Sequence, residues 1–318
     1  MKKFLIRICV FLLLFFVFDN IIYFLLQTQR PLDYKIFIDS KTSFFYNQYK
    51  TDLLIIGDSH IADALDTRVI EEETDLSAYN LGIYSSSPFE NYFTTKSALE
   101  HMDSPPKIVV LGTNPIMFQR DLNKGSFTPI ILKSNFELFF NSNNGVDFSF
   151  FIKTYREKKL LKHIVKNLLG YKYIPTRIIE DSYNGHLKFY NQMNNINWDN
   201  ADLNKYSNSI NKNQIKYFKK NIEFLLEYDI DVIIVNPPIY SKEFTQLSKN
   251  INYIKFKKTI DSIKNNYQLN VFNPEGNLLF NELLQNDFLN KQHLNYNGSI
   301  KFSNDFSDFL KNFNQKTQ

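Results

Sequence analysis

Two patterns alternate along most of the chain: short continuous apolar runs and longer amphipathic stretches. Five runs have the length and apolar content of buried strands: 52–56, 78–81, 107–111, 231–235 and, more weakly, 269–272. Four stretches have helical periodicity: 89–101, 214–228, 252–266 and 299–313. Continuous apolar strands separated by helices are typical of a parallel sheet that is covered on both faces. The pattern therefore predicts an α/β protein with a three-layer α/β/α, flavodoxin-like fold.

The connection between the third and fourth predicted strands is about 120 residues long, far more than one crossover helix needs. We therefore assign residues 50–115 and 213–313 to the sheet domain and residues 116–212 to an insertion. The insertion is rich in Phe, Tyr, Asn and Lys, has little strand pattern, and has one partly helical stretch at 150–169. We expect the insertion to form a cap over the edge of the sheet at which the carboxyl ends of the strands lie, where ligands bind in such folds. A poorly structured surface excursion is the alternative.

A separate apolar segment opens the chain. Lys2, Lys3 and Arg7 precede and overlap an apolar run at 4–18, which resumes at 21–26. Taken as one segment, it is long enough to span the ~30 Å hydrocarbon core of a membrane, which takes ~20 residues. A cleaved signal peptide is the alternative. Its apolar region would have only ~7–15 residues and would end at a small-residue cleavage site, which this sequence lacks after the run.

The basic flank of this segment predicts its orientation, because positively charged residues stay on the cytoplasmic side of a membrane. We therefore predict a single-pass anchor at 1–26 in the inner (cytoplasmic) membrane and a polar linker at 27–49. The sheet domain is then expected outside the cytoplasm.

Composition and charge exclude several other classes of protein. The net charge of +4 is small and scattered, and no basic stripe or nucleic-acid-binding motif is present, so we predict no nucleic-acid partner. The single cysteine, Cys9, permits neither an intramolecular disulfide nor a cysteine-based metal site. His101, His163 and His186 share no ligand spacing. We therefore predict no metal and no cofactor.

Polar signatures follow the first three predicted strands, where ligands bind in an open parallel sheet. The first is Gly57-Asp58-Ser59-His60. A serine at a strand-to-helix turn exposes its hydroxyl and places its amide at a helix N-terminus, which suits a nucleophile that attacks a carbonyl. We interpret Asp58 as a helix cap, and His60 as structural, with packing beside the nucleophile as the alternative.

Two further donors and a histidine complete the candidate set. Gly82, after the second strand, allows close backbone approach to a ligand and offers its N–H. Asn114, in Gly112-Thr113-Asn114-Pro115 after the third strand, offers a side-chain amide. A fourth signature, Asn290-Lys291-Gln292-His293-Leu294-Asn295, precedes the last predicted helix.

The set Gly57-Asp58-Ser59, Gly82, Gly112-x-Asn114 and His293-Leu294-Asn295 resembles the four blocks of the SGNH/GDSL hydrolase superfamily, in the family's order. The resemblance covers about residues 50–115 and 229–310. It implies Ser59 as the nucleophile and His293 as its base. It also implies an oxyanion hole formed by the amides of Ser59 and Gly82 and the side chain of Asn114.

Together with the N-terminal segment, the sequence is similar to membrane-anchored members that modify polymers of the cell envelope. This narrower resemblance implies an acylated glycan or other envelope polymer as partner. A membrane protein that donates the acyl group is a further partner that this resemblance allows.

The chain departs from the family pattern at Asn290, where the family has an aspartate three residues before the histidine. An amide can hold an imidazole but supplies no charge, and the same change in a serine protease lowers kcat by ~10⁴-fold. Asp287 is a candidate stand-in. The leading interpretation is an esterase or O-acyltransferase, favoured by Ser59, His293 and both donors. Asn290 favours the alternative, a weak or inactive domain that binds or assembles glycans.

Overall fold

The computed structural model describes residues 2–28, 32–46, 50–122, 161–162, 165, 169, 181–189, 196–198, 203–206, 208–273 and 283–317. The chain divides into two compact units. One comprises Met1–Lys35 and Asn135–Pro175, and the other comprises Ile36–Ser134 and Thr176–Gln318. The cap that the sequence predicts, and most of the helical stretch expected at 150–169, lie outside the described residues.

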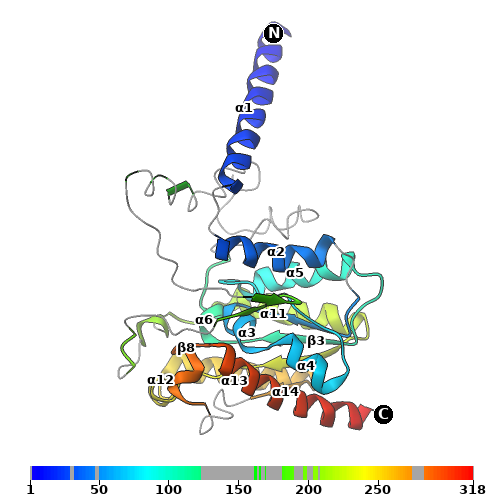
Figure 1. Ribbon diagram of the computed structural model, residues 1–318, viewed down its shortest axis with the longest axis vertical. Helices are drawn as coiled ribbons and strands as arrows, with labels where there is room; N and C mark the ends of the chain where they lie inside the picture. The colour runs from blue at the N-terminus through cyan, green and yellow to red at the C-terminus, as the bar shows by residue number, and fades with distance from the viewer. Residues whose placement is uncertain are drawn as a thin grey trace. The chain divides into compact units, whose positions relative to one another are not determined.

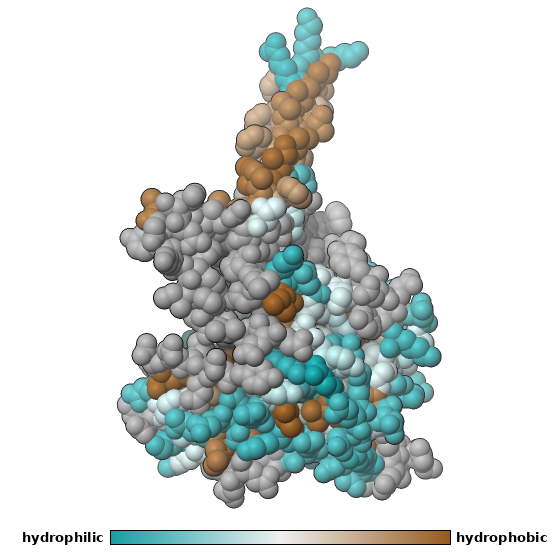
Figure 2. All heavy atoms as spheres, in the orientation of Figure 1, coloured by the Kyte–Doolittle hydropathy of each residue, from teal (hydrophilic) through white to brown (hydrophobic). Residues whose placement is uncertain are grey.

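Helix α1 (Lys2–Thr28) is the main described element of the first unit. Its segment Lys2–Leu26 has a mean hydropathy of 2.5, and its 25 residues give a length of about 37 Å. Figure 2 shows hydrophobic side chains along this helix and hydrophilic ones at its N-terminal end. Length and composition therefore suffice for a membrane span, as expected of a signal anchor or a signal sequence.

A five-stranded parallel sheet forms the centre of the second unit, with the strand order β2-β1-β3-β6-β7 (Figure 1). Its strands are β1 (Leu53–Ile56), β2 (Ala78–Asn80), β3 (Ile108–Gly112), β6 (Asp231–Val235) and β7 (Asn270–Phe272). All five coincide with the predicted strands. The order reverses at β1, as in flavodoxin-like sheets, so the predicted fold is confirmed.

Helices cover the sheet in two layers (Figure 1). One layer contains α2 (Leu32–Tyr46), α5 (Pro88–His101), α11 (Lys212–Glu227) and α13 (Ile251–Tyr267). The other contains α3 (Ser59–Ala64), α4 (Thr67–Thr74) and α14 (Tyr296–Thr317). The short helices are α6 (Pro115–Phe118), α12 (Ser241–Leu247), η2 (Leu203–Tyr206) and η3 (Gln285–Asp287).

Strand residues alternate between the two cores, because successive side chains of a strand point to opposite faces of the sheet. Leu54 and Val109 pack with the α2 layer, whereas Ile55 and Val110 pack with the α3 layer. All four are fully buried. Burial on both faces explains why the strands are continuous apolar runs rather than alternating ones.

Helix α2 corrects the prediction of a polar linker at 27–49. Its apolar residues Phe37 and Phe44 are buried, but between them lies Lys41, which is also fully buried. The Lys41 ammonium donates hydrogen bonds to the main-chain carbonyls of Asn80, at 2.7 Å, and Gly185. Burial lowers the pKa of Lys41 to about 7, against the opposing effect of Asp63. An amphipathic helix is recognised in a sequence by its continuous apolar face. Lys41 interrupts that face in α2, so the sequence does not predict this helix.

A hairpin within the predicted insertion also packs on the sheet domain. Strands β4 (Asp181–Tyr183) and β5 (His186–Lys188) pair in antiparallel fashion, and β5 contacts α3. The turn residues Asn184 and Gly185 have φ angles of 40° and 81°. At Gly185 a Cβ would lie 2.0 Å from the carbonyl oxygen of Asn80, so only glycine fits. The domain boundary expected at 212 therefore lies earlier, near Thr176.

Candidate active site

The turn that carries Ser59 follows β1 directly. Asp58 caps α3, and its carboxylate accepts a hydrogen bond from the main-chain N–H of His60 at 3.0 Å. Ser59 is the first residue of α3, so its N–H has no acceptor within the helix. Ser59 is only 9% exposed. The turn thus places a hydroxyl and a main-chain donor on the same residue, as the sequence predicts.

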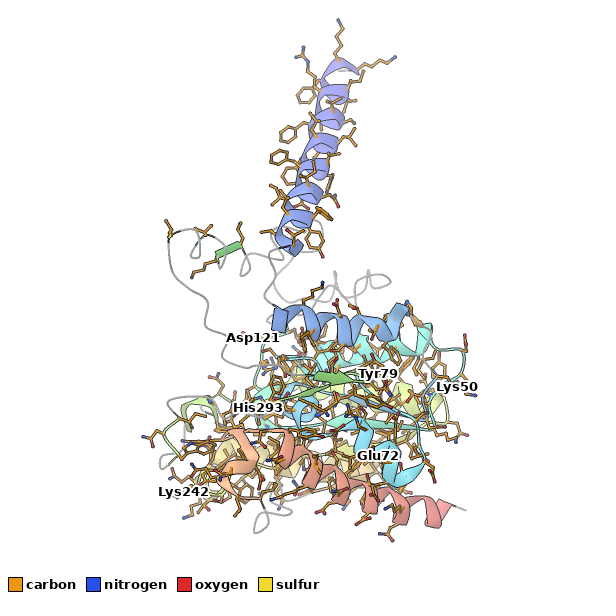
Figure 3. All side chains as sticks on the ribbon, in the orientation of Figure 1. Lys50, Glu72, Tyr79, Asp121, Lys242 and His293 are labelled. Atoms are coloured by element: carbon orange, nitrogen blue, oxygen red, sulfur yellow. The ribbon has the colours of Figure 1, made fainter. Side chains whose placement is uncertain are left out.

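His293 reaches Ser59 from a second hairpin, which the sequence does not predict. Strands β8 (Phe288–Asn290) and β9 (His293–Leu294) pair so that Asn290 lies opposite His293. Strand β9 packs on α3, the helix that begins with Ser59. Figure 3 labels His293 in this part of the sheet domain. The distance from Ser59 Oγ to His293 Nε2 is 2.8 Å, and that from His293 Nδ1 to Asn290 Oδ1 is 2.9 Å.

The orientation of the Asn290 amide determines the tautomer of His293. Asn290 Oδ1 also accepts a hydrogen bond from the main-chain N–H of Gln292 at 3.0 Å, which identifies this atom as the oxygen. An oxygen can only accept, so His293 Nδ1 must carry the proton. Nε2 is then unprotonated and accepts from the Ser59 hydroxyl. This is the tautomer that a general base requires.

Asp58 is the charged centre of the site. Besides the N–H of His60, it accepts hydrogen bonds from His60 Nδ1, at 3.0 and 3.1 Å, and from Asn114 Nδ2, at 2.8 Å. Arg120 Nη2 lies 3.8 Å from Asp58 Oδ2. Burial alone would raise the pKa of Asp58, but His60, Arg120 and Asn114 lower it to about 2. Asp58 is therefore a buried carboxylate near neutral pH, and its role exceeds the helix cap that the sequence predicts.

Asn114 lies beside Ser59's turn, as predicted, and is held from both ends of its amide. Its Oδ1 accepts from the main-chain N–H of Met117 at 3.0 Å, which caps α6. One Nδ2 hydrogen is directed at Asp58. The same Nδ2 also lies 3.2 Å from His60 Nδ1. Asn114 can therefore donate its second hydrogen to a substrate only when that ring nitrogen carries a proton and does not accept it.

Gly82 has a different partner from the one predicted. Its N–H donates to Asn80 Oδ1 at 2.9 Å, within its own loop. A role for Gly82 in an oxyanion hole would require that this hydrogen bond be shared. A Cβ at Gly82 would lie 2.9 Å from the backbone of Ala62, so glycine allows this loop to pack against α3.

His60 packs beside Ser59 and His293, which is the alternative that the sequence left open rather than the purely structural role that it favours. Its ring stacks on the ring of His293, with centroids 4.5 Å apart and an angle of 22° between the ring planes. His60 is 6% exposed. The site therefore contains two parallel imidazoles, one bonded to Asn290 and the other to Asp58.

Asp287 does not replace the missing carboxylate, so that prediction is wrong. Its Oδ2 accepts from the main-chain N–H of Leu284 at 2.7 Å and from Lys301 Nζ at 2.9 Å. Asp287 thus caps a turn and forms an ion pair with α14. Only two residues separate Asn290 from His293 across a tight hairpin, whereas Asp287 lies in η3, before strand β8.

Arg120 and Glu90 extend the polar network, and neither stands out in the sequence. Arg120 also donates to the main-chain carbonyl of Ser86. Burial raises the pKa of Glu90 to about 7, against the opposing effects of Arg120 and Ser87. The position of Arg120, shortly after the third strand-end signature, is the only sequence signal that could have indicated it.

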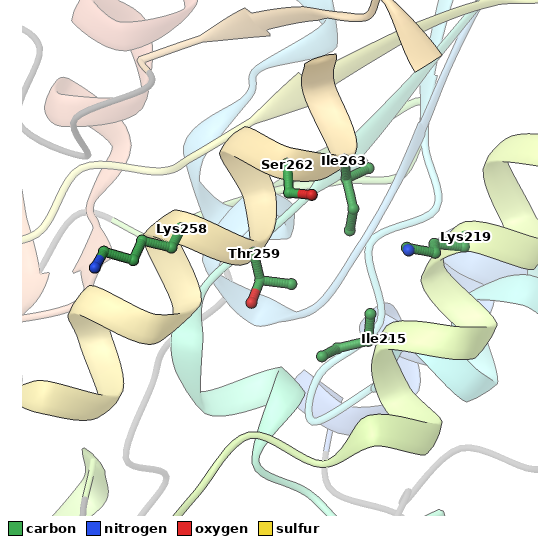
Figure 4. Close-up of a pocket in the computed structure, with 6 residues that line it drawn as sticks. All are labelled: Ile215, Lys219, Lys258, Thr259, Ser262 and Ile263. Carbon is green, nitrogen blue, oxygen red and sulfur yellow. The ribbon is translucent and has the colours of Figure 1, made fainter. Parts of the chain in front are cut away.

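Among the residues that the structure describes, no group of three or more His, Cys, Asp or Glu could hold a metal ion. A pocket of about 230 Å³ lies between α11 and α13 and is lined by Ile215, Lys219, Lys258, Thr259, Ser262 and Ile263 (Figure 4). These helices belong to the layer opposite α3, so the pocket is not part of the Ser59 site.

Comparisons with known proteins add no assignment. A scan against models of protein families found no match, and a search of curated proteins found no significant match.

Proposed function

We propose that the chain is a serine esterase or O-acyltransferase of the SGNH type, which acts on acyl esters of an envelope or exported glycan. The observation that carries this proposal is the continuous hydrogen-bond chain from Ser59 Oγ through both nitrogens of His293 to Asn290. It joins residues far apart in sequence in the order that nucleophilic catalysis needs.

The reaction follows from the protonation state of this chain. Ser59 Oγ attacks the ester carbonyl while its proton passes to His293 Nε2. The N–H of Ser59 and the side chain of Asn114 donate to the oxyanion. The C–O bond then breaks, and His293 returns its proton to the departing alcohol. Water or a sugar hydroxyl, deprotonated by His293, then attacks the acyl carbonyl. The bond to Ser59 Oγ breaks, and His293 returns the proton to Ser59 Oγ.

A glycan-binding or assembly component with a weak or inactive centre is the second candidate. Asn290 favours it, because an amide cannot stabilise the imidazolium that forms during attack. The tautomer of His293 and the short contact to Ser59 Oγ favour an enzyme, because a binding module has no need for either.

Turnover of short acyl esters by the full chain in detergent separates the two candidates. We expect ester cleavage, and, in the presence of a soluble oligosaccharide, we expect acyl groups on the sugar if the enzyme is a transferase. The control is the same protein after heat denaturation. Retention of the oligosaccharide without any ester cleavage would contradict the proposal and favour the glycan-binding candidate.

We further propose that α1 anchors the chain in the inner membrane, with the sheet domain outside the cytoplasm. The hydrophobic surface of α1 and the basic residues at its start support this orientation. An alkaline phosphatase fused after Lys50 is expected to be active, and a fluorescent protein that matures only in the cytoplasm should be dark at the same position. The reverse result would place the domain in the cytoplasm.

A further inference from the structure

We propose that Asp58 and His60 form a second positioning pair, which supplies His293 with the negative charge that Asn290 cannot provide. This inference rests on the proposed function, because the imidazolium that it concerns forms when Ser59 acts as nucleophile. Asp58 and His60 would act through His293 and not on the substrate.

The stacking of the two imidazoles is the first observation. With centroids 4.5 Å apart and planes inclined by 22°, the ring of His293 lies over the face of His60. A cation within ~6 Å of the centre of an aromatic face is attracted by the electrons of that ring. The positive charge that His293 gains during attack therefore develops over the face of His60.

The hydrogen bonds of Asp58 indicate how His60 is prepared for this role. Donors of three kinds converge on its carboxylate: the main-chain N–H of His60, the Nδ1 of His60 and the Nδ2 of Asn114. The pKa of Asp58 is lowered to about 2, and an ionised carboxylate can only accept hydrogen bonds, so His60 Nδ1 must carry the proton that lies between them. Asn114 Nδ2, which lies 3.2 Å from the same ring nitrogen, then directs its hydrogen at Asp58. A carboxylate bonded to the N–H of a neutral imidazole makes the rest of the ring richer in electrons.

The charged and titratable groups around His293 come from two elements. Helix α3 and its cap contribute Ser59, His60 and Asp58, and strand β8 contributes the neutral Asn290. Arg120 faces Asp58 at 3.8 Å and offsets part of its charge. The neighbouring Lys291 is directed at Glu243. Asp58 is thus the anion that the described hydrogen bonds and ring contacts connect to His293.

The pH dependence of ester turnover tests this pair. In Asp58→Asn, asparagine still caps α3 but carries no charge. Because the imidazolium of His293 loses support, the acidic limb of kcat/KM should move to lower pH by about one unit, and kcat should fall by about tenfold to a hundredfold. KM should change little. His60→Leu, which removes the stacked ring, should move the limb in the same direction.

The matched control is Asp66→Asn. Asp66 is an equally buried aspartate that caps the next helix, α4, and accepts from the N–H of Arg68 at 3.0 Å. Its replacement should leave the acidic limb of the pH profile of kcat/KM at the pH of the wild type. Asn290→Asp in the Asp58→Asn background should return the limb toward its original pH, because it restores a negative charge beside His293.

The outcomes separate this inference from the proposed function. A wild type that cleaves no ester overturns both. An active wild type whose acidic limb stays in place in Asp58→Asn and in His60→Leu overturns the positioning pair alone, as does an equal shift in Asp66→Asn. If Asp58→Asn fails to fold, the acidic limb of the pH profile of kcat/KM for His60→Leu decides whether the positioning pair exists.

Discussion

Replacement of Ser59 by alanine should lower kcat/KM for short acyl esters by about 10⁴-fold or more. The change removes the atom that forms the acyl-enzyme, and residual catalysis can come only from substrate binding and the oxyanion donors. His293→Ala should cost about as much. Because the two residues act as one unit, the double variant should be little worse than either single one.

A matched control for this prediction is Ser307→Ala. Ser307 is fully buried in α14 and donates to the carbonyl of Ser303 at 2.8 Å, so it tests the loss of a buried hydroxyl elsewhere in the same domain. Its kcat/KM should match that of the wild type. Ester cleavage that persists in Ser59→Ala, with an unchanged melting temperature, would show that another residue or a contaminant carries the activity.

Asn290→Asp should raise turnover by about tenfold to a hundredfold, or about 1.4–2.7 kcal/mol of activation free energy. The two donors that Asn290 accepts from, His293 Nδ1–H and the N–H of Gln292, suit a carboxylate oxygen equally well. The geometry is therefore kept, and the negative charge stabilises the imidazolium. Asn290 is partly exposed, so the new carboxylate remains solvated.

The control for added charge is Asn250→Asp. Asn250 caps α13 and accepts from the N–H of Asn252 at 2.9 Å, in the layer opposite α3. Its substitution adds the same charge away from the site and should leave kcat unchanged. Equal or lower turnover in Asn290→Asp, while Ser59→Ala still abolishes activity, would mean that charge at this position does not limit the reaction.

The central sheet could be predicted from the sequence because burial on both faces makes each strand a continuous apolar run. The strand-end residues Ser59 and Asn114 followed from the same pattern, since the carboxyl ends of parallel strands meet at one edge. The contact between Ser59 and His293, at 2.8 Å, is implied in the sequence only by the family resemblance, because the two residues lie more than 200 positions apart.

Other features could not be predicted because their sequence signals are short or misleading. Helix α2 has a buried lysine, Lys41, on the face that would otherwise be apolar. The hairpin that carries His293 has strands of only three and two residues, too short for any periodicity. The Asn184-Gly185 turn was detectable, because this pair favours the two-residue turn of a hairpin.

The polar network around Ser59 and His293 is the feature that sequence reasoning could predict least. The stack of His60 on His293 joins a helix and a hairpin more than 200 residues apart, and no local pattern reports such a contact. Asp58 looked like an ordinary helix cap because its further partners, Asn114 and Arg120, lie in another loop.

We propose Ser59 as a nucleophile that His293 activates. The most direct measurement is the intact mass of the folded full chain after exposure to a fluorophosphonate, followed by peptide mapping. We predict one adduct per chain, located on Ser59, absent from Ser59→Ala and formed much more slowly in His293→Ala. A chain that gains no adduct, while a control esterase in the same tube is fully labelled, would contradict the claim.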